Sequence, residues 1–337
     1  MKERNTNIEI LRLLCMVAIF GWHILIHGYG LKNIEHMAVG GGNMFTFCAL
    51  SSLFAPATYC FMFISGYYGL NFRVKKAVSL EMWLIITCFL VCILKLFMNY
   101  HLGVRDLITS FIPISSFKWW FMTYYVLVMF ISPIINKGFE SESKKMVSIT
   151  LLTLIIYQFF SFVRLIPNGG SSFLGLLTVY LIGRYCNVYK FDISVNKAIL
   201  LFVLFYVLQL SGMLLCGHYM QKILFRTLNY NTPFILMMSI SLFYIFKGMT
   251  PRYSKRINYC IQPVLFIYLI TEGLGGRFYR LIRDIIDDNF LMGASVFFIA
   301  IVSCLIVGRL IMWFTNMLIR FTITKWNYLY ETKRFKY

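Results

Sequence analysis

Glu9, Arg12 and His23 occur within the first long apolar stretch of the sequence, residues 8–31. Arg12 and His23 are eleven residues apart, which in an α-helix corresponds to a rise of about 16.5 Å and an angular offset of about 20°. They would therefore share one helix face, with the arginine near the start of the helix and the histidine deep inside it. Because charged groups inside an apolar span are costly, the sequence predicts that these residues have a function.

The chemistry follows from the two side chains. A guanidinium holds phosphate through paired charge-assisted hydrogen bonds. A neutral imidazole accepts a proton from a hydroxyl, which is the step that an alcohol requires before it attacks a thioester. We therefore predict a catalytic group in which Arg12 is a phosphate clamp, Glu9 is its acidic neighbour, and His23 is a general base or a transient acyl carrier. In the structural alternative, Arg12 pairs with Glu9 and reaches the membrane surface, while His23 bonds a neighbouring helix.

A second candidate group follows the next apolar stretch, residues 44–70. Ser65-Gly66-Tyr67-Tyr68-Gly69 contains two glycines that permit local unwinding of a helix, and three cations come directly after it. Exposed backbone N–H groups beside cations favour anion binding. We predict that a phosphorylated ligand is bound by Arg12 together with Ser65, Gly66, Arg73, Lys75 and Lys76. The alternative is ordinary positive charge at a helix exit.

Glu272, Arg277 and Trp120 are candidates for contact with a second substrate on the membrane side opposite to Arg12. Glu272 is expected either to orient His23 or a sugar hydroxyl, or to form a surface pair with Arg277. Trp120 fits an aromatic belt at the membrane surface, with stacking on a sugar as a second use. Residues 277–288 combine charged and apolar side chains at helical spacing, which predicts a short amphipathic helix.

No metal site is predicted from the sequence. His23 and His27 are four residues apart, but no third ligand is evident near them, and the cysteines are isolated. The sequence contains no Walker loop, dinucleotide fingerprint or Gly-x-Ser-x-Gly motif. These absences give no support to a nucleotide-driven pump or a serine hydrolase.

The elements that must position these residues are membrane spans. Of the 337 residues, 59% are hydrophobic and 13% are charged, which excludes an ordinary soluble protein. Apolar runs of about 17 to 25 residues predict an all-α polytopic membrane protein, with one transmembrane domain over residues 1–315. The ten predicted spans are residues 8–31, 44–70, 78–100, 119–136, 146–166, 172–187, 198–216, 233–249, 258–274 and 290–315.

The distribution of positive charge predicts the orientation. Of the lysines and arginines, twenty are assigned to the side of the two termini and eight to the opposite side. The positive-inside rule therefore predicts that the N- and C-termini are cytoplasmic. Because the positive residues lie between apolar runs, the net charge of +19 reports topology, and no nucleic-acid partner is predicted. Residues 316–337 interleave basic and aromatic side chains, which predicts a cytoplasmic tail that contacts anionic membrane lipids.

Several motifs together resemble the acyltransferase-3 family of bacterial integral-membrane acyltransferases. Asn7-Ile8-Glu9-Ile10-Leu11-Arg12 followed by His23 is similar to the opening of that family, in which arginine, ten residues and histidine occupy the first helix. The resemblance runs nearly end to end. Its other segments are Cys60-Phe61-Met62-Phe63-Ile64-Ser65-Gly66-Tyr67, Trp120-Phe121, Ser132-Pro133-Ile134-Ile135-Asn136, Tyr180-Leu181-Ile182-Gly183-Arg184-Tyr185 and Phe266-Ile267-Tyr268-Leu269-Ile270.

The resemblance implies an O-acyltransferase of the bacterial inner membrane. It implies transfer of an acyl group, often acetyl, from cytoplasmic acyl-CoA such as acetyl-CoA to a hydroxyl of a cell-surface polysaccharide or its lipid-linked precursor. The sequence departs from the family pattern twice. Arg73-Val74-Lys75 replaces an Arg-x-Arg, which keeps the charge but loses one bidentate group. Thr271 replaces a histidine that is common after Tyr-Leu-Ile, which leaves Thr271 and Glu272 as polar substitutes.

Two other functions would also use many spans and cationic residues. A non-enzymatic polysaccharide flippase or exporter has no need of His23 as a base. A membrane-bound polymerase typically has large outer loops, and the loops predicted here are short. Replacement of His23 separates transfer from export, because only transfer requires a proton acceptor.

Overall fold

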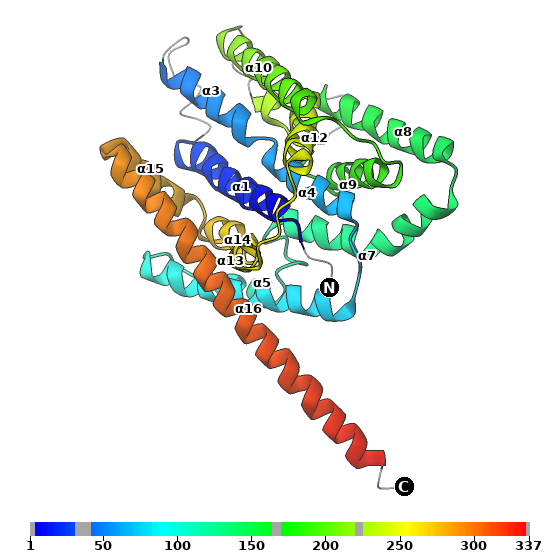
Figure 1. The fold of residues 1–337 in the computed structure, drawn as a ribbon. Helices are drawn as coiled ribbons and strands as arrows, with labels where there is room; N and C mark the ends of the chain where they lie inside the picture. Colours follow the sequence, from blue (N-terminus) through cyan, green and yellow to red (C-terminus); the bar gives the residue numbers. More distant parts are fainter. Residues whose placement is uncertain (1–3, 31–41, 164–169, 220–224, 335–337) are drawn as a thin grey trace.

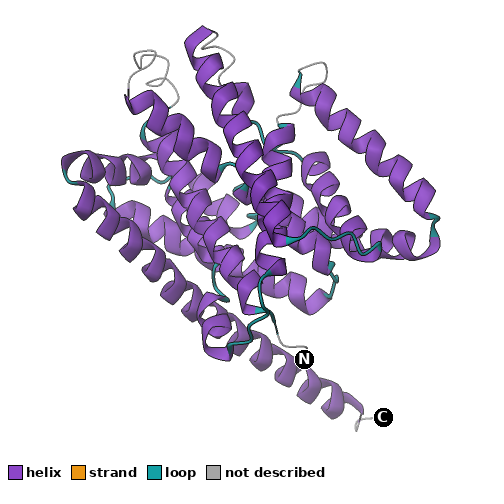
Figure 2. Cartoon of the chain, turned by 45° about the horizontal axis from the view of Figure 1, so that its top comes forward, coloured by secondary structure: helices purple, strands orange, loops and turns teal. Residues whose placement is uncertain are grey.

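The computed structural model describes residues 4–30, 42–163, 170–219 and 225–334, and every regular element in these ranges is a helix (Figure 2). The prediction of an all-α protein is confirmed. The helices are α1 (Thr6–His23), η1 (Ile24–Gly28), α3 (Gly42–Phe54), α4 (Ala57–Tyr68), α5 (Val74–Phe97), α6 (Val104–Phe111), α7 (Trp120–Ser141), α8 (Lys144–Phe162), α9 (Phe173–Val188), α10 (Val195–Tyr219), η2 (Phe225–Leu228), α12 (Pro233–Gly248), α13 (Lys255–Ile261), α14 (Leu265–Leu274), α15 (Gly276–Asp288) and α16 (Phe290–Arg334).

Eight helical segments among the described residues are long and apolar enough to cross a membrane. The two other predicted spans, 172–187 and 233–249, correspond to α9 and α12, which have 16 residues each. The last residues of the predicted spans 8–31 and 146–166 lie outside the described residues. The structure therefore supports a multi-pass membrane protein, and the cytoplasmic placement of both termini stays a prediction.

Two predicted spans are interrupted by proline, which the sequence analysis did not anticipate. The span 44–70 divides into α3 and α4 at Ala55-Pro56, and the span 258–274 divides into α13 and α14 around Pro263. Proline lacks a backbone N–H and disrupts the preceding turn of a helix. The Pro56 carbonyl accepts hydrogen bonds from the Cys60 backbone N–H at 2.9 Å and from the Ser239 hydroxyl of α12 at 2.8 Å. The Ser239 contact therefore ties α12 to the start of α4.

Helix α1 occupies the middle of the bundle, as Figure 1 shows, between α3 and α4 on one side and α14 on the other. Its sequence permits this position because apolar side chains occur on most of its surface. Leu11, Cys15 and Phe20 are each exposed by 1% or less. A helix that is apolar on all faces is stable only when other helices or lipid surround it. Burial of α1 therefore brings Arg12 and His23 into the interior of the protein.

Helix α16 continues without a break from Phe290 to Arg334 and extends past the rest of the bundle in Figure 1. The predicted boundary between a domain at 1–315 and a tail at 316–337 does not coincide with the end of a helix. The side chains beyond residue 321, which include most of the predicted basic and aromatic anchor, lie outside the described residues. Their contact with lipid stays a prediction.

Helices α4 and α9 approach each other closely through glycine. A Cβ added to Gly66 would lie 2.2 Å from the Tyr180 carbonyl oxygen, and one added to Gly183 would lie 2.6 Å from the Phe63 carbonyl oxygen. Helices pack at this separation only where a side chain is absent. Gly66 remains helical and buried, so its observed role is helix packing, and local unwinding begins only at Gly69, where φ is +77°.

Candidate active site

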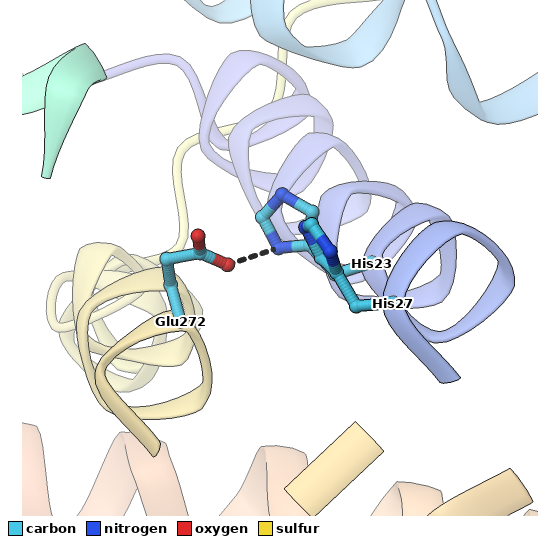
Figure 3. A group of neighbouring side chains, drawn as sticks. All are labelled: His23, His27 and Glu272. Atoms are coloured by element: carbon cyan, nitrogen blue, oxygen red, sulfur yellow. Dashed lines mark ion pairs between the residues drawn. The ribbon is translucent and has the colours of Figure 1, made fainter. Parts of the chain in front are cut away.

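His23 is the last residue of α1, and its side chain is directed toward α14 (Figure 3). Its Nδ1 atom lies 3.0 Å from Oε2 of Glu272, and the histidine is only 7% exposed. The expectation that Glu272 orients His23 therefore agrees with the geometry. If Nδ1 carries the proton and donates it to the carboxylate, Nε2 keeps its lone pair and can accept a proton from a substrate.

Tyr279 completes this group, and the sequence analysis did not identify it. Its hydroxyl donates to Glu272 Oε2 at 3.1 Å and lies 3.1 Å from His23 Nδ1. The side chain is fully buried, and burial raises the pKa of the Tyr279 phenol well above its ordinary value, so the hydroxyl stays protonated. In the sequence, Tyr279 is simply a tyrosine on the apolar face of the predicted amphipathic helix. Such a residue cannot be told apart from one that only packs.

The short π-helix η1 follows His23 directly and sets the geometry around it. Wide turns of this type recur at functional sites. Gly28 in this turn approaches α15 so closely that a Cβ would lie 2.9 Å from the Tyr279 carbonyl oxygen. The Gly28 carbonyl also accepts a hydrogen bond from Arg283 Nη1 at 2.8 Å. These contacts dock α15 on the end of α1, which fixes Tyr279 beside His23.

His27, one turn after His23, also belongs to this cluster (Figure 3). Its ring centroid lies 5.5 Å from that of His23 and 5.8 Å from that of Tyr279. His23, His27 and Glu272 offer ligand atoms that all lie within 4.8 Å of one another. The fold thus supplies the third group that was not evident in the sequence, and the donor set is one that zinc accepts. The direct contact between His23 and Glu272 equally fits a hydrogen-bonded pair.

The predicted cationic residues meet in one cavity of about 570 Å³ at the end of the bundle near the N-terminus. Glu9, Arg12 and Ser65 line it on one side. The loop after α4 and the start of α5 contribute the predicted cations Arg73, Lys75 and Lys76, while Arg4 adds one that was not predicted. Gly66 is the exception among the predicted residues, because it packs against Tyr180 instead of lining the cavity.

Arg12 both lines this cavity and pairs with Glu9. Its Nη1 atom donates to Glu9 Oε1 at 2.6 Å, and Glu9 is 4% exposed. The ion pair expected in the structural alternative is therefore present, yet the guanidinium still borders the cavity. A buried carboxylate can hold the planar guanidinium in one orientation and leave its other N–H groups for a ligand.

The loop between α4 and α5 is held in place by two residues of the recognised motifs. The Tyr180 hydroxyl accepts from the Leu70 backbone N–H at 3.2 Å and donates to Asn136 Oδ1 at 3.0 Å. Asn136 Nδ2 in turn donates to the Leu70 carbonyl at 2.9 Å. This closed network fixes Leu70, which lines the cavity three residues before Arg73. It explains how a loop keeps its cations at defined positions.

Arg277 and Trp120 are not brought to His23. Arg277 donates to the backbone carbonyls of Met98 and Asn99 at 3.0 and 3.1 Å, at the end of α5. The expected surface pair between Glu272 and Arg277 is therefore not formed, because Gly275, with φ of +77°, ends α14 between them and redirects the chain. Trp120 contacts the rings of Phe121, Tyr124 and Tyr230.

The cavity approaches the histidine through an aromatic layer. Phe121 and Met122, at the start of α7, line its deep end. The Phe121 ring meets the edge of the Tyr268 ring at 6.1 Å between centroids, and the Tyr268 ring lies 6.2 Å from that of His23. The rings of Phe121 and Tyr268 therefore lie between the cavity and His23.

The matches to known proteins agree with this arrangement. No curated protein and no solved structure matches the chain. A family model described as an acyltransferase domain matches residues 5–313, a range that holds α1, α4, α14, α15 and all the site residues discussed above. The chain belongs to the acyltransferase-3 family and is a membrane acyltransferase.

Proposed function

We propose that this protein is an O-acetyltransferase that moves acetyl from cytoplasmic acetyl-CoA to a hydroxyl of a cell-surface polysaccharide or its lipid-linked precursor in the bacterial inner membrane. One observation carries the proposal. Arg12 borders a cavity with a cluster of cations, while His23, on the same helix, contacts Glu272 deep in the bundle. A phosphorylated thioester fits these two chemically different ends.

The cation cluster fits the donor. Acetyl-CoA carries its phosphates at one end and its thioester at the other. Arg12, Arg73 and Lys75 border one cavity, together with Arg4 and Lys76. Their positive charge is offset in part by Glu9 alone among the lining residues. The excess charge supports phosphate binding at this end and directs the thioester toward Phe121 and His23.

The histidine group fits the acceptor. In the proposed reaction, the acceptor hydroxyl gives its proton to Nε2 of His23 as its oxygen attacks the thioester carbon. Glu272 holds Nδ1–H and stabilises the imidazolium that forms, while Tyr279 holds Glu272. The protonated histidine then returns the proton to the departing thiolate. The engagement of Nδ1 by Glu272 leaves Nε2 as the ring nitrogen that takes part in the reaction.

The test is transfer of radiolabelled acetyl from acetyl-CoA to glycan in inverted membrane vesicles. We expect label in the glycan with the wild type and its loss in His23→Ala and in Arg12→Ala. Lys197→Ala, which removes an exposed cation of α10 that does not border the cavity, is the matched control and should retain activity. Full transfer by His23→Ala, or label independent of CoA, would contradict the proposal and favour an exporter.

A further inference from the structure

The cavity lined by Arg12 and the other cations, here called the donor cavity, is also lined by the first turn of α7. Phe121 and Met122 line it, and α7 is a helix of 22 residues that begins at Trp120. The first N–H groups of an α-helix have no partner inside the helix, and they carry a partial positive charge. No side chain caps this end: Trp119, the residue before the helix, makes no capping hydrogen bond. These N–H groups alone do not define a site.

Tyr268 provides an independent indication. It is 4% exposed, and its hydroxyl is a buried polar group that donates a hydrogen bond to no described residue. The hydroxyl lies beside the backbone of Phe121, at the start of α7. A buried hydroxyl that donates to nothing is unfavourable, and such groups are rare in folded proteins. The cost is explained if a substrate atom accepts the hydrogen bond.

Two other hydroxyls near Tyr268 have acceptors. Thr271, on the same helix, donates to the Ile267 carbonyl at 2.7 Å, and Tyr279 donates to Glu272. Tyr268 and Glu272 are four residues apart on α14, so they lie on one face of the helix. That face therefore presents the carboxylate that holds His23 and, one turn earlier, a donor with no acceptor.

We propose that the Tyr268 hydroxyl and the first backbone N–H groups of α7 form a binding site for the carbonyl oxygen of the acyl thioester. This inference rests on the proposed function and names the part of the site that receives developing charge. The position fits because Phe121 lines the donor cavity and Tyr268 lies between Phe121 and His23. The thioester would thus have a proton acceptor on one side and hydrogen-bond donors on the other.

The acceptor oxygen forms a bond to the thioester carbon and its proton moves to His23, while the carbonyl electron pair moves to the carbonyl oxygen. Tyr268 and α7 donate hydrogen bonds to this oxyanion. When the carbonyl re-forms, the carbon–sulfur bond breaks and the thiolate of CoA takes the proton from His23. The products are an ester and a thiol, and no other reactant is required.

Tyr268→Phe in the full-length protein tests the inference by kinetics. It removes one oxygen atom and keeps the ring that packs against Phe121. We expect kcat for acetyl transfer to fall about 100-fold, as is typical for loss of one oxyanion donor, with KM for acetyl-CoA within about twofold. Thermal stability in detergent should fall little, because the hydroxyl donates no hydrogen bond to a described residue.

Tyr244→Phe is the matched control. Tyr244 is also a fully buried tyrosine, but its hydroxyl donates to the Phe191 carbonyl at 2.7 Å and it lines neither the donor cavity nor the histidine group. This variant should lose thermal stability and keep its kcat. The two variants therefore give opposite results, which separates a catalytic hydroxyl from a structural one.

A spectroscopic measurement needs no acceptor glycan. Hydrogen bonds to a carbonyl oxygen lower its stretching frequency, so bound acetyl-CoA labelled with ¹³C at the carbonyl should show a lower frequency than free acetyl-CoA. Tyr268→Phe should return it toward the free value, and Tyr244→Phe should not. An unchanged frequency and kcat in Tyr268→Phe, or a rise in KM alone, would overturn the inference while wild-type transfer upholds the proposed function. Wild-type protein that transfers no acetyl would overturn both.

Discussion

His23 Nδ1 and Glu272 Oε2 lie 3.0 Å apart, although the two residues belong to α1 and α14, which are far apart in the sequence. The contact pairs a buried imidazole with a partly exposed carboxylate, and Tyr279 holds the same carboxylate oxygen. A carboxylate in this position selects the imidazole tautomer and stabilises its charged form. The relationship makes His23 suited to remove a proton, and several measurable consequences depend on it.

Glu272→Gln should lower kcat about 100-fold and leave KM for acetyl-CoA unchanged. The amide keeps the size of the side chain but cannot stabilise a histidine that has gained a proton. Steady-state transfer rates in membrane vesicles measure both constants. Glu142→Gln, which alters an exposed carboxylate after α7, is the control and should behave as wild type. Equal kcat for Glu272→Gln and wild type would show that Glu272 does not assist His23.

Tyr279→Phe should lower kcat about tenfold, because a hydrogen bond to a charged group contributes about 1.5 kcal/mol. The substitution should also change how the stability of the folded protein depends on pH in the alkaline range. The pKa of the Tyr279 phenol is raised in the folded protein, so the folded state holds this proton more tightly than the unfolded state. The associated stability is complete below pH 10 and is lost as the pH rises through and above the ordinary pKa of 10.0.

The measurement is the unfolding temperature in detergent against pH. The other tyrosines contribute equally to both proteins, so the difference between wild type and Tyr279→Phe reports Tyr279 alone. We expect this difference to shrink above about pH 10. A constant difference across the alkaline range would contradict the assignment of a raised pKa to this phenol.

Removal of the cations that border the donor cavity should weaken binding of acetyl-CoA. Arg73→Ala and Lys75→Ala should each raise KM about tenfold with a smaller effect on kcat, because the phosphates lie far from the bond that breaks. KM should also rise with salt concentration in the wild type and less steeply in the variants. Lys197→Ala is the reference cation outside the cavity. A KM unaffected by either change would place the CoA phosphates elsewhere.

Gly66→Ala should destabilise the protein by about 2 kcal/mol, because the new Cβ would lie 2.2 Å from the Tyr180 carbonyl oxygen and force α4 and α9 apart. Thermal unfolding in detergent measures the effect. Gly212→Ala on α10 is the matched control, since nothing lies within 4 Å of its added Cβ. It should leave stability unchanged or raise it, because alanine favours the helix over glycine. Loss of donor binding without loss of stability would instead assign Gly66 to the cavity.

Treatment with a metal chelator should leave acetyl transfer unchanged, because no metal ion takes part in the proposed step. The measurement compares initial rates before and after chelation and dialysis, with zinc returned in a third sample. His27→Ala should likewise retain most activity. Loss of activity on chelation that zinc restores would show that His23, His27 and Glu272 form a metal site.

The features that the sequence determined are local. Apolar runs specified where helices form, and the spacing of Arg12 and His23 placed both on one face of α1, because helical periodicity depends only on neighbouring residues. The cluster of Arg73, Lys75 and Lys76 was likewise visible as adjacent charges. These predictions agree with the structure, in which Arg12 and the cluster border one cavity and His23 lies deeper along the same helix.

The features that only the tertiary structure decided depend on how helices pack. Tyr279 could not be distinguished from a packing residue until the contact between α15 and the π-turn after His23 placed its hydroxyl on Glu272. Gly66 was expected to bind a ligand, but the approach of α9 uses its missing side chain for packing. Tyr268 looks like any aromatic residue of an apolar helix until its hydroxyl is found without an acceptor among the described residues. Side-chain partners from distant helices are set by interhelical packing, which no local pattern encodes.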